Sequence, residues 1–481
     1  MNRTKCFLLL AIFLFACGTA RYEDPETVMD LITADNIFEI NKILASPEME
    51  GRLAGTEGYN KAAQWTADRF KEWGLKPVYN NNFLQPFKVR YNEMRETSFS
   101  LILPGENVNE DQRTVELEMY KDFCPTLYSG FGNVKTEVVF AGFGITDLEL
   151  GWDDYSGVDV KGKIVAIFNG TPQVQGKDFS KYSERVHKLV IASEHEAAGL
   201  ILINMVVVSG SGEYQEGLPM VMVGNEVARM LFEHSGLNVN EVREELRTGK
   251  HHSFETGVLA QIDAKGAHHS DAETYNVVGM IEGSDPELKE EYIVFGGHLD
   301  HLGPWPVLHP GASDNASGSA VVIGLANAFS LMKDPPKRSI VFVLFGAEEL
   351  GLLGSKYFVN NLPDFPSIPV LMSNHDMNGV GNALNINGGK TYPDMYEIIL
   401  EVNAEFSVNE NITAGEISAE GGNSDYAPFL RKGIPAYNNS VRGGKRYGVH
   451  TAEDNISVID PQILEDIVRL YFMAGYRYAN K

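Results

Sequence analysis

The sequence has very little cysteine. Only 3 of its 481 residues are cysteines, and two of them, Cys6 and Cys17, lie close to the N-terminus. Cys124 is then left without an intramolecular partner, so no disulfide framework is expected. A chain of this length with 43% hydrophobic residues can instead bury a substantial core, enough for two domains of ordinary size.

Basic residues are scarce relative to acidic ones. The 40 Lys and Arg residues face 65 Asp and Glu residues, which gives a formal net charge of −25 at pH 7. Such a chain repels polyanions on average. This balance argues against nucleic acids and strongly acidic substrates as partners.

Long apolar runs are absent except near the N-terminus. There a short basic segment precedes an apolar stretch from Phe7 to Phe15, which is too short for a permanent transmembrane helix. This pattern predicts an export signal at residues 1–16. Because Leu-Phe-Ala leads directly into Cys17, the cleavage region resembles the lipobox of bacterial lipoproteins. We therefore expect a cell-envelope lipoprotein, periplasmic or surface-exposed and tethered to the membrane through Cys17, with secretion as the alternative.

Two kinds of sequence pattern divide the rest of the chain. Residues 56–73 space apolar side chains three and four positions apart, which predicts an amphipathic surface helix. Beyond residue 113 the pattern changes to short β-branched runs separated by glycines. These runs lie at residues 137–145, 162–170, 199–208 and 218–224. The domains we expect are one formed by 24–112 with 263–481, and an inserted β-rich module at 113–262.

Four histidines stand in polar sequence near the end of this module. The segments HHSFETG and AKGAHHSD contain His251, His252, His268 and His269. Neither segment has an accompanying carboxylate or cysteine pattern typical of a metal site. We expect these histidines to be solvated loop residues.

From Tyr275 onward, apolar runs alternate with helical patterns. The runs YNVVGMIEG, EYIVFGGHLD, SIVFVLFGAEE and IPVLMSNHDM are separated by helical segments, one of them at about 317–332. This alternation predicts an α/β fold with a mixed, mostly parallel central sheet and helices on both faces. Ligands of such sheets bind beyond the carboxyl ends of the strands. Polar residues at those ends are therefore the candidates for a site.

Polar residues interrupt the apolar pattern at four places and recur in a late loop. They are His298 and Asp300, then Asp314 before a helix, the pair Glu348 and Glu349, Asp376, and His450 in the loop YGVHTAEDN. Taken singly, each has a structural explanation, because an Asp near a helix start often caps the helix and a buried His is usually only hydrogen-bonded. Asp300 lies two residues from His298, on the same face of an extended chain, where it could orient that imidazole.

Together these side chains match the needs of divalent metal ions. Two histidines and three carboxylates suit two metals that share one carboxylate. Imidazole and carboxylate without thiolate favour Zn²⁺, with Mn²⁺ or Co²⁺ as substitutes. The adjacent carboxylates of Glu348 and Glu349 repel each other unless cations neutralise them or one keeps a proton. One glutamate could bind a cation while the other accepts a proton from a metal-activated water.

The motifs GGHLDHLG, SDNASG, FGAEELGLLGS, NHDMNG, SDYAPF and HTAED occur in this order. From about residue 45 to 481 the chain resembles the co-catalytic zinc aminopeptidases, whose relatives include glutamate carboxypeptidase and glutaminyl cyclase. The segment GFGITDLELGWDDYSGVDVKGKIVAIF resembles a protease-associated domain. The resemblance thus implies a zinc exopeptidase fold with a protease-associated domain inserted in it.

Carried over position by position, the resemblance implies a role for each candidate residue. The metal ligands would be His298 and Asp376 on one zinc, Glu349 and His450 on the other, and Asp314 bridging both. Glu348 would be the general base, and Asp300 the partner of His298. The implied activity is hydrolysis of the first peptide bond of peptides with a free amino terminus.

Three positions depart from the family pattern. Val449 precedes the last histidine, where a tyrosine is often found, so Tyr426 and Tyr447 are candidates for oxyanion assistance without either being assigned. His375 stands where an apolar residue is usual, and Tyr426 stands where a histidine is common. None of these changes falls on an implied ligand.

Other outcomes remain open on the same scaffold. A carboxypeptidase would need basic residues near the site to neutralise a terminal carboxylate, and Arg442 and Lys445 are candidates, or else solvated loop charges. Cyclisation of N-terminal glutamine is a second alternative. A non-catalytic binding protein is an alternative of another class, but it predicts eroded ligands, whereas all five ligand positions and the base are present.

Overall fold

The structure is a computed structural model. It describes residues 20–105, 111–204, 206, 208, 214–362, 369–420, 422–444 and 448–481. The predicted export signal and Cys17 lie outside the described residues, as do Lys445 and Tyr447. Within these described ranges, no helix combines the length and apolarity that crossing a membrane would require.

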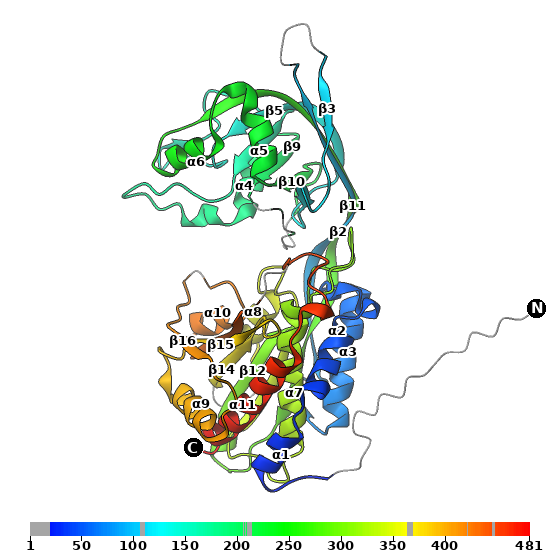
Figure 1. The fold of residues 1–481 in the computed structure, drawn as a ribbon, viewed down its shortest axis with the longest axis vertical. Coiled ribbons are helices and arrows are strands. Elements are labelled where there is room, and N and C mark those ends of the chain that lie inside the picture. The colour runs from blue at the N-terminus through cyan, green and yellow to red at the C-terminus, as the bar shows by residue number, and fades with distance from the viewer. Residues whose placement is uncertain are drawn as a thin grey trace, which may run out of the picture.

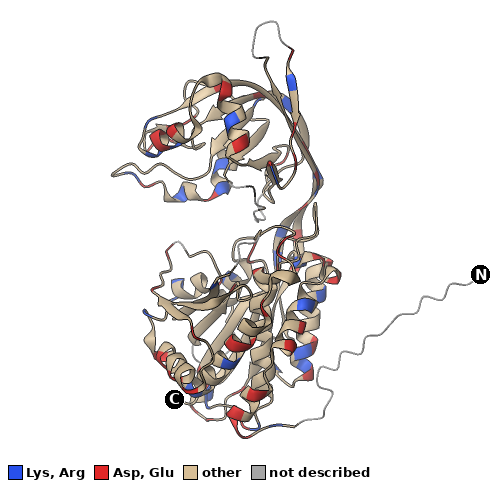
Figure 2. Cartoon of the chain, viewed as in Figure 1, with Lys and Arg blue, Asp and Glu red and all other residues tan. Residues whose placement is uncertain are grey.

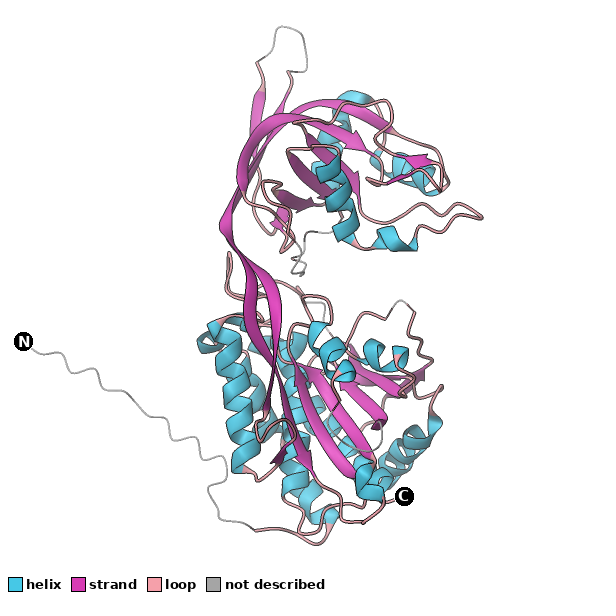
Figure 3. Cartoon of the chain, turned by 180° about the vertical axis from the view of Figure 1, so that it is seen from behind, coloured by secondary structure: helices cyan, strands magenta, loops and turns pink. Residues whose placement is uncertain are grey.

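Two long strands connect the two parts of the chain (Figures 1 and 3). β2 (Leu84–Leu103) and β11 (Ser253–Ile281) pair antiparallel along most of their length. In the upper part of Figure 1, β11 also pairs with β5 (Gly132–Ala141), and in the lower part it pairs with β13 (Ser339–Phe345). A single hydrogen-bonded sheet therefore runs through both parts.

The lower sheet is mixed and mostly parallel, as the sequence predicted. Besides β13 it contains β12 (Tyr292–His298), β14 (Pro369–His375), β15 (Gly381–Asn387), β16 (Ile412–Gly415) and β17 (Ala436–Gly443). The neighbours β12/β13, β12/β14, β14/β17 and β15/β16 are parallel, while β15/β17 and β11/β13 are antiparallel. β12 lies at the centre, between β13 and β14.

Helices cover both faces of this sheet. One layer contains α1 (Pro25–Leu31), α2 (Ala34–Leu44), α3 (Glu57–Glu72), α7 (Gly318–Ser330), α9 (Pro393–Phe406) and α11 (Pro461–Ala479), and the other contains α8 (Leu353–Asn360) and α10 (Tyr426–Arg431). Side chains of β12 alternate between the layers, since Ile293 and Phe295 pack with the first and Tyr292 and Val294 with the second. Both faces are apolar because both are buried.

The outer surface of the first layer is charged. α3 buries Ala63, Ala67 and Phe70 against the core, as the three-and-four spacing predicted. Its outward positions carry acidic and basic residues interspersed along the helix (Figure 2). The helix is therefore amphipathic and lies at the surface.

The upper part has its own hydrophobic core. It is built on β3 (Arg113–Glu116), β4 (Phe123–Pro125), β5, β8 (Ile164–Phe168), β9 (Gly199–Ile203) and β10 (Met220–Val223), with α4 (Arg185–Glu194), α5 (Asn225–Phe232) and α6 (Val239–Arg247). Strands β8, β9 and β10 are buried along their whole length. Cys124 is buried and forms no disulfide bond within the described residues.

The expectation that the paired histidines lie in solvated loops is wrong for His268 and His269. Both belong to β11, where His268 stacks on Tyr214 and His269 stacks on Tyr91 with ring centroids 4.2 and 4.4 Å apart. Polar residues can continue a strand here because β2 supplies the backbone hydrogen bonds on one side. Two register shifts, after Lys265 and after His269, interrupt the ladder in this stretch.

Candidate metal centre

The candidate residues gather where the central strands end. β12 ends at His298, β13 ends three residues before Glu348, and β14 ends next to Asp376. Parallel neighbours place their carboxyl ends at the same edge of the sheet. The topology alone therefore brings these side chains together from distant parts of the chain.

Asp314 reaches the same edge from the turn before α7. It lies in the irregular helical segment Ala312–Ser317, whose backbone departs from helical geometry at Asp314 and Asn315. The side chain of Asn315, not Asp314, accepts the hydrogen bond from the Gly318 amide at 3.0 Å. The capping explanation for Asp314 is therefore wrong, and its carboxylate is available to the site.

The first group of possible metal ligands is His298, Asp314 and Asp376. His298 Nε2 lies 3.3 Å from Asp314 Oδ1 and 3.5 Å from Asp376 Oδ1. The three ligand atoms all lie within 4.8 Å of one another, which is close enough to hold one metal ion. Ser424 Oγ donates to the other oxygen of Asp376 at 2.6 Å and fixes the orientation of this carboxylate.

The second group adjoins the other oxygen of Asp314. His450 Nε2 lies 3.0 Å from Asp314 Oδ2 and 3.4 Å from Glu349 Oε1. His450 Nδ1 lies 2.9 Å from the carbonyl oxygen of Val208, in the upper part. Because a carbonyl only accepts, Nδ1 carries a proton, and Nε2, which faces the two carboxylates, is the nitrogen that could bind a metal. Asp314 thus faces the two groups with its two oxygens, as a bridging carboxylate would.

Asp300 holds the turn that carries the two glutamates. Its Oδ1 accepts from the Glu348 amide at 3.0 Å, and its Oδ2 accepts from the Glu349 amide at 3.2 Å. His298 Nδ1 lies 3.7 Å from Asp300 Oδ1 and 3.2 Å from its backbone oxygen. Asp300 therefore adjoins His298, as expected, but the hydrogen bonds of its carboxylate go to the neighbouring turn.

The surroundings separate the proton affinities of the adjacent glutamates. Burial, together with the nearby charges of Glu349, Asp425 and Asp376, raises the pKa of Glu348 well above its usual value, although His298 opposes the shift. Burial alone would raise the pKa of Glu349 as well. Its contacts with His450 and His301 instead hold that pKa below the usual range. Glu349 is thus kept ionised, while Glu348 has a strong affinity for a proton.

The donor set fits divalent metal ions. Buried carboxylates of Asp314 and Glu349 lie together with Asp376. The ion pairs that these carboxylates make within the described part of the chain are with histidines and not with Lys or Arg. Buried carboxylates whose direct ion-pair partners are imidazoles form an arrangement that bound cations stabilise. Oxygen and imidazole donors without sulfur suit zinc.

Sequence reasoning missed three buried residues of this centre. His301 Nδ1 lies 2.9 Å from Glu349 Oε1, so His301 forms a possible metal group with Asp314 and Glu349. Asp454 accepts hydrogen bonds from the backbone of the Asp314 turn, and Arg52 binds backbone carbonyls of the adjoining loops. The repeated histidine in HLDH and the aspartate in HTAED were the available signals, and for Arg52 there was none.

The remaining candidates lie less centrally. Arg442 is exposed on β17, which favours the interpretation that it is a solvated charge. Tyr426 is buried at the start of α10, next to Asp425. His375 is buried at the end of β14, with its ring edge-on to that of Tyr471. Its apolar surroundings lower the pKa of His375 to about 3, so it behaves as a neutral core residue.

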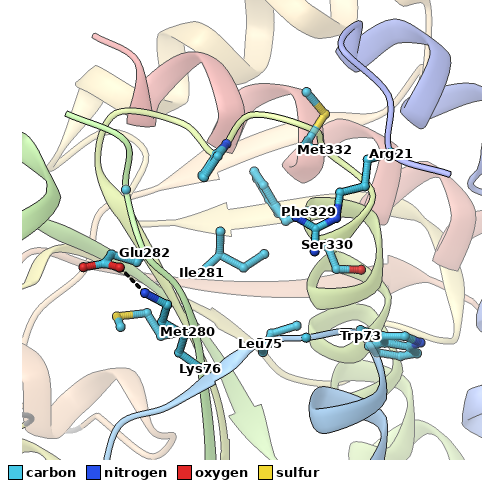
Figure 4. A pocket seen from close by; sticks show the side chains of 13 residues that line it. Arg21, Trp73, Leu75, Lys76, Met280, Ile281, Glu282, Phe329, Ser330 and Met332 are labelled. Carbon is cyan, nitrogen blue, oxygen red and sulfur yellow. Dashed lines mark hydrogen bonds and ion pairs between the residues drawn. The ribbon is translucent and has the colours of Figure 1, made fainter. Parts of the chain in front are cut away.

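A separate cavity of about 260 Å³ lies at the other end of the sheet. Figure 4 shows its lining, with Arg21, Phe329 and Met332 near one another and Lys76 paired with Glu282. Ile281, in the same lining, pairs with Ile340 near the start of β13. The cavity is therefore separated from the metal groups by the length of a strand.

The mixed α/β sheet thus presents carboxylate–imidazole groups beyond its strand ends that could hold metal ions. Residues 276–474 match the model of peptidase family M28. The resemblance drawn from the motifs is thereby confirmed. The match includes all the predicted ligands.

Three known proteins illustrate the similarity. Leupeptin-inactivating enzyme 1 of Streptomyces exfoliatus is 38% identical over 34% of this chain and 35% of its own length. Aminopeptidase YwaD of Bacillus subtilis is 28% identical over 43% and 45%. The chain thus aligns with less than half the length of these relatives. The structure of an aminopeptidase from Aneurinibacillus sp. strain AM-1 superposes with a TM-score of 0.65 at 21% identity, covering 94% of this chain and 96% of that one. That likeness supports the fold.

Proposed function

We propose that this protein is a zinc-dependent aminopeptidase that hydrolyses the N-terminal peptide bond of peptides. The observation that carries the proposal is that Asp314 is shared by two groups of ligands, with Glu348 beside them. The five ligands would be His298, Asp314, Glu349, Asp376 and His450, holding two zinc ions. The names of the similar proteins, among them two aminopeptidases, support the same activity.

The chemistry divides between the metals and Glu348. Two zinc ions held there would supply Lewis-acid activation of a water and of the scissile carbonyl. Glu348 takes the proton released when the water attacks and returns it to the leaving amine. Bound cations beside Glu348 would favour its ionised form, which is the form that can accept a proton. Asp300 fixes the backbone from which Glu348 projects.

The test is a screen of aminoacyl chromogenic amides with metal-stripped and zinc-restored protein. We expect release of the chromophore from substrates with a free amino group, loss of release on stripping, and recovery with zinc. N-terminally blocked substrates should be inert. Activity that survived the removal of all bound metal would contradict the proposal.

Among the described residues, the placement of the basic side chains argues against carboxypeptidase action. Arg442 is exposed, and the buried Arg52 already donates to four backbone carbonyls. Neither is disposed to bind a terminal carboxylate beside Asp314. Hydrolysis of N-blocked dipeptides with a free carboxylate would favour that alternative instead, and ring closure of N-terminal glutamine would favour a cyclase.

The proposal extends to the remaining parts of the chain. Residues 1–16 would be an export signal, and Cys17 would carry lipid that tethers the protein to a membrane of the cell envelope. Residues 113–262 would be a protease-associated domain inserted in the peptidase domain. Mass spectrometry of the mature N-terminus tests the first point, since an acylated cysteine is expected there and an intact Met1 would contradict it.

A further inference from the structure

Arg52 is a fully buried cation that donates to four backbone carbonyls. Its Nε donates to Leu299 O at 2.8 Å, and its Nη2 donates to Gly311 O at 2.9 Å. Its Nη1 donates to Pro310 O at 2.9 Å and to Leu44 O. A planar guanidinium suits such a task, because it directs several donors to fixed points at once.

Three of these carbonyls belong to the two loops that carry the metal groups, and the fourth, Leu44 O, lies at the end of α2. Leu299 stands between His298 and Asp300, while Pro310 and Gly311 lead into Asp314. The guanidinium therefore bridges the loop after β12 and the turn before α7. The backbone of Arg52 adds a further link, since its carbonyl accepts from the His301 amide at 3.1 Å.

The backbone around Arg52 is held in a sparsely populated conformation. Glu50, Gly51 and Arg52 have φ values of 50°, 64° and 50°. A Cβ at Gly51 would lie 2.5 Å from the carbonyl oxygen of His309, so only glycine fits there. Non-glycine residues keep such angles only where surrounding contacts impose them. The segment is thus tightly constrained beside the loops that it binds.

Asp454 holds the same turn from the opposite end of the chain. Its two carboxylate oxygens accept from the amides of Ser313 and Asp314 at 2.8 and 3.0 Å, and its backbone oxygen accepts from Ala312. Asp454 and Arg52 also attract each other electrostatically. Burial lowers the pKa of Arg52 to about 10, so the cation persists at neutral pH.

We propose that Arg52 and Asp454 are positioning residues that fix the placement of Asp314, which the two metal groups share, relative to His298. Arg52 ties the Asp314 turn to the His298 loop, and Asp454 fixes the direction of the Asp314 backbone. The inference rests on the proposed metal binding. A lysine at position 52 would keep the charge but, as a single point donor, could not bridge both loops.

The experiment measures metal binding without recourse to activity. Metal-free wild type, Arg52→Lys and Arg52→Met are titrated with zinc against a competing chelator, and the absorption spectrum of each cobalt-loaded protein is recorded. We expect zinc affinity at least about tenfold weaker in both variants, with an altered cobalt spectrum. Arg338→Met is the matched control, because Arg338 pairs with Glu291 at the other end of β13. It should bind both metals as the wild type does.

Wild-type zinc affinity and cobalt spectrum in Arg52→Lys would overturn the proposal, even if that variant melted at a lower temperature. Should the Arg52 variants fail to fold, Asp454→Asn is decisive, because its amide nitrogen cannot accept from the turn. Weakened zinc binding in Asp454→Asn supports the proposal, and unchanged binding overturns it. A wild type that binds no zinc would instead refute the proposed function.

Discussion

At the scale of the residue, two adjacent glutamates can take different roles at one site only if their environments differ. Contacts with His450 and His301 keep Glu349 ionised, whereas burial and like charges give Glu348 a high proton affinity. Two neighbouring carboxyl groups whose pKa values are driven apart can act as ligand and base. The doubled glutamate in FGAEELG is explained by this separation.

Glu348→Gln should reduce kcat by about 10²–10⁴-fold, because the amide cannot accept the proton from the attacking water. Zinc content should not change, since Glu348 is not one of the proposed ligands. The measurement pairs steady-state kinetics with metal analysis. Glu453→Gln, the same change at an exposed position of the His450 loop, is the control. Wild-type turnover in Glu348→Gln would show that the base lies elsewhere.

His301→Gln should weaken zinc binding by about 10–100-fold, because His301 orients the carboxylate of Glu349. His309→Phe is the matched control, since both ring nitrogens of the buried His309 lack a hydrogen-bond partner among the described residues. Calorimetric titration of the metal-free proteins measures both affinities. Equal affinities in the two variants would mean that the contact between His301 and Glu349 has no role in metal binding.

Sequence could identify the candidate ligands but not the residues that hold them in place. His298, Glu349 and Asp376 follow recognisable strands, and the topology of a parallel sheet joins their ends. Arg52 gave no such signal, because it binds carbonyls of residues 247 and 259 positions away. Backbone carbonyls carry no residue identity, so a motif cannot reveal that contact.

At the scale of the element, α4 carries a buried cation in the upper part. Lys188 Nζ donates to the carbonyl oxygens of Phe143 and Gly170. Burial lowers the pKa of Lys188 to about 7, despite the opposing charge of Asp154. The unfolded chain, with a lysine pKa of about 10.4, therefore binds more protons than the folded protein between these pH values.

The stability of the upper part should accordingly rise between about pH 7 and pH 10, because Lys188 is deprotonated in the folded state while the unfolded chain still binds the proton. Lys188→Met removes this contribution. We expect the wild type to gain stability over Lys188→Met across that window, measured by hydrogen exchange of β8 and β9 in urea. If the stability of the two proteins changed with pH in the same way, Lys188 could not be the source of the expected rise.

The sequence predicted the strands β8, β9 and β10 of the upper part more securely than the long strands β2 and β11. β8, β9 and β10 are uninterrupted buried runs, which read as strands from composition alone. β2 and β11 carry many polar residues, including His268 and His269, because parts of them face solvent. Their pairing joins residues up to 193 positions apart, as between Leu84 and Val277, and local periodicity does not encode such contacts.

At the scale of the whole molecule, bound zinc should stabilise the folded protein, because it binds buried carboxylates that exist as a group only in the native state. A ligand at 1,000 times its Kd adds about 4 kcal/mol. Metal removal should lower the calorimetric unfolding temperature by several degrees, and zinc should restore it. Glu348→Gln should show the same response. An unchanged unfolding temperature would contradict a metal site at this position.

The upper and lower parts of the molecule also meet at the candidate metal centre. The sheet continues through both, and the carbonyl of Val208 in the upper part contacts His450. Displacing the upper part would remove that hydrogen bond and free the His450 ring to rotate. The upper part therefore contributes to the geometry of the metal centre.

The most direct measurement is a zinc-edge anomalous difference map of crystals of the zinc-loaded protein. The account predicts two peaks, one among His298, Asp314 and Asp376 and one among Asp314, Glu349 and His450, with Glu348 coordinating neither. A map with no peak beside Asp314, or with Glu348 as a ligand, would contradict it.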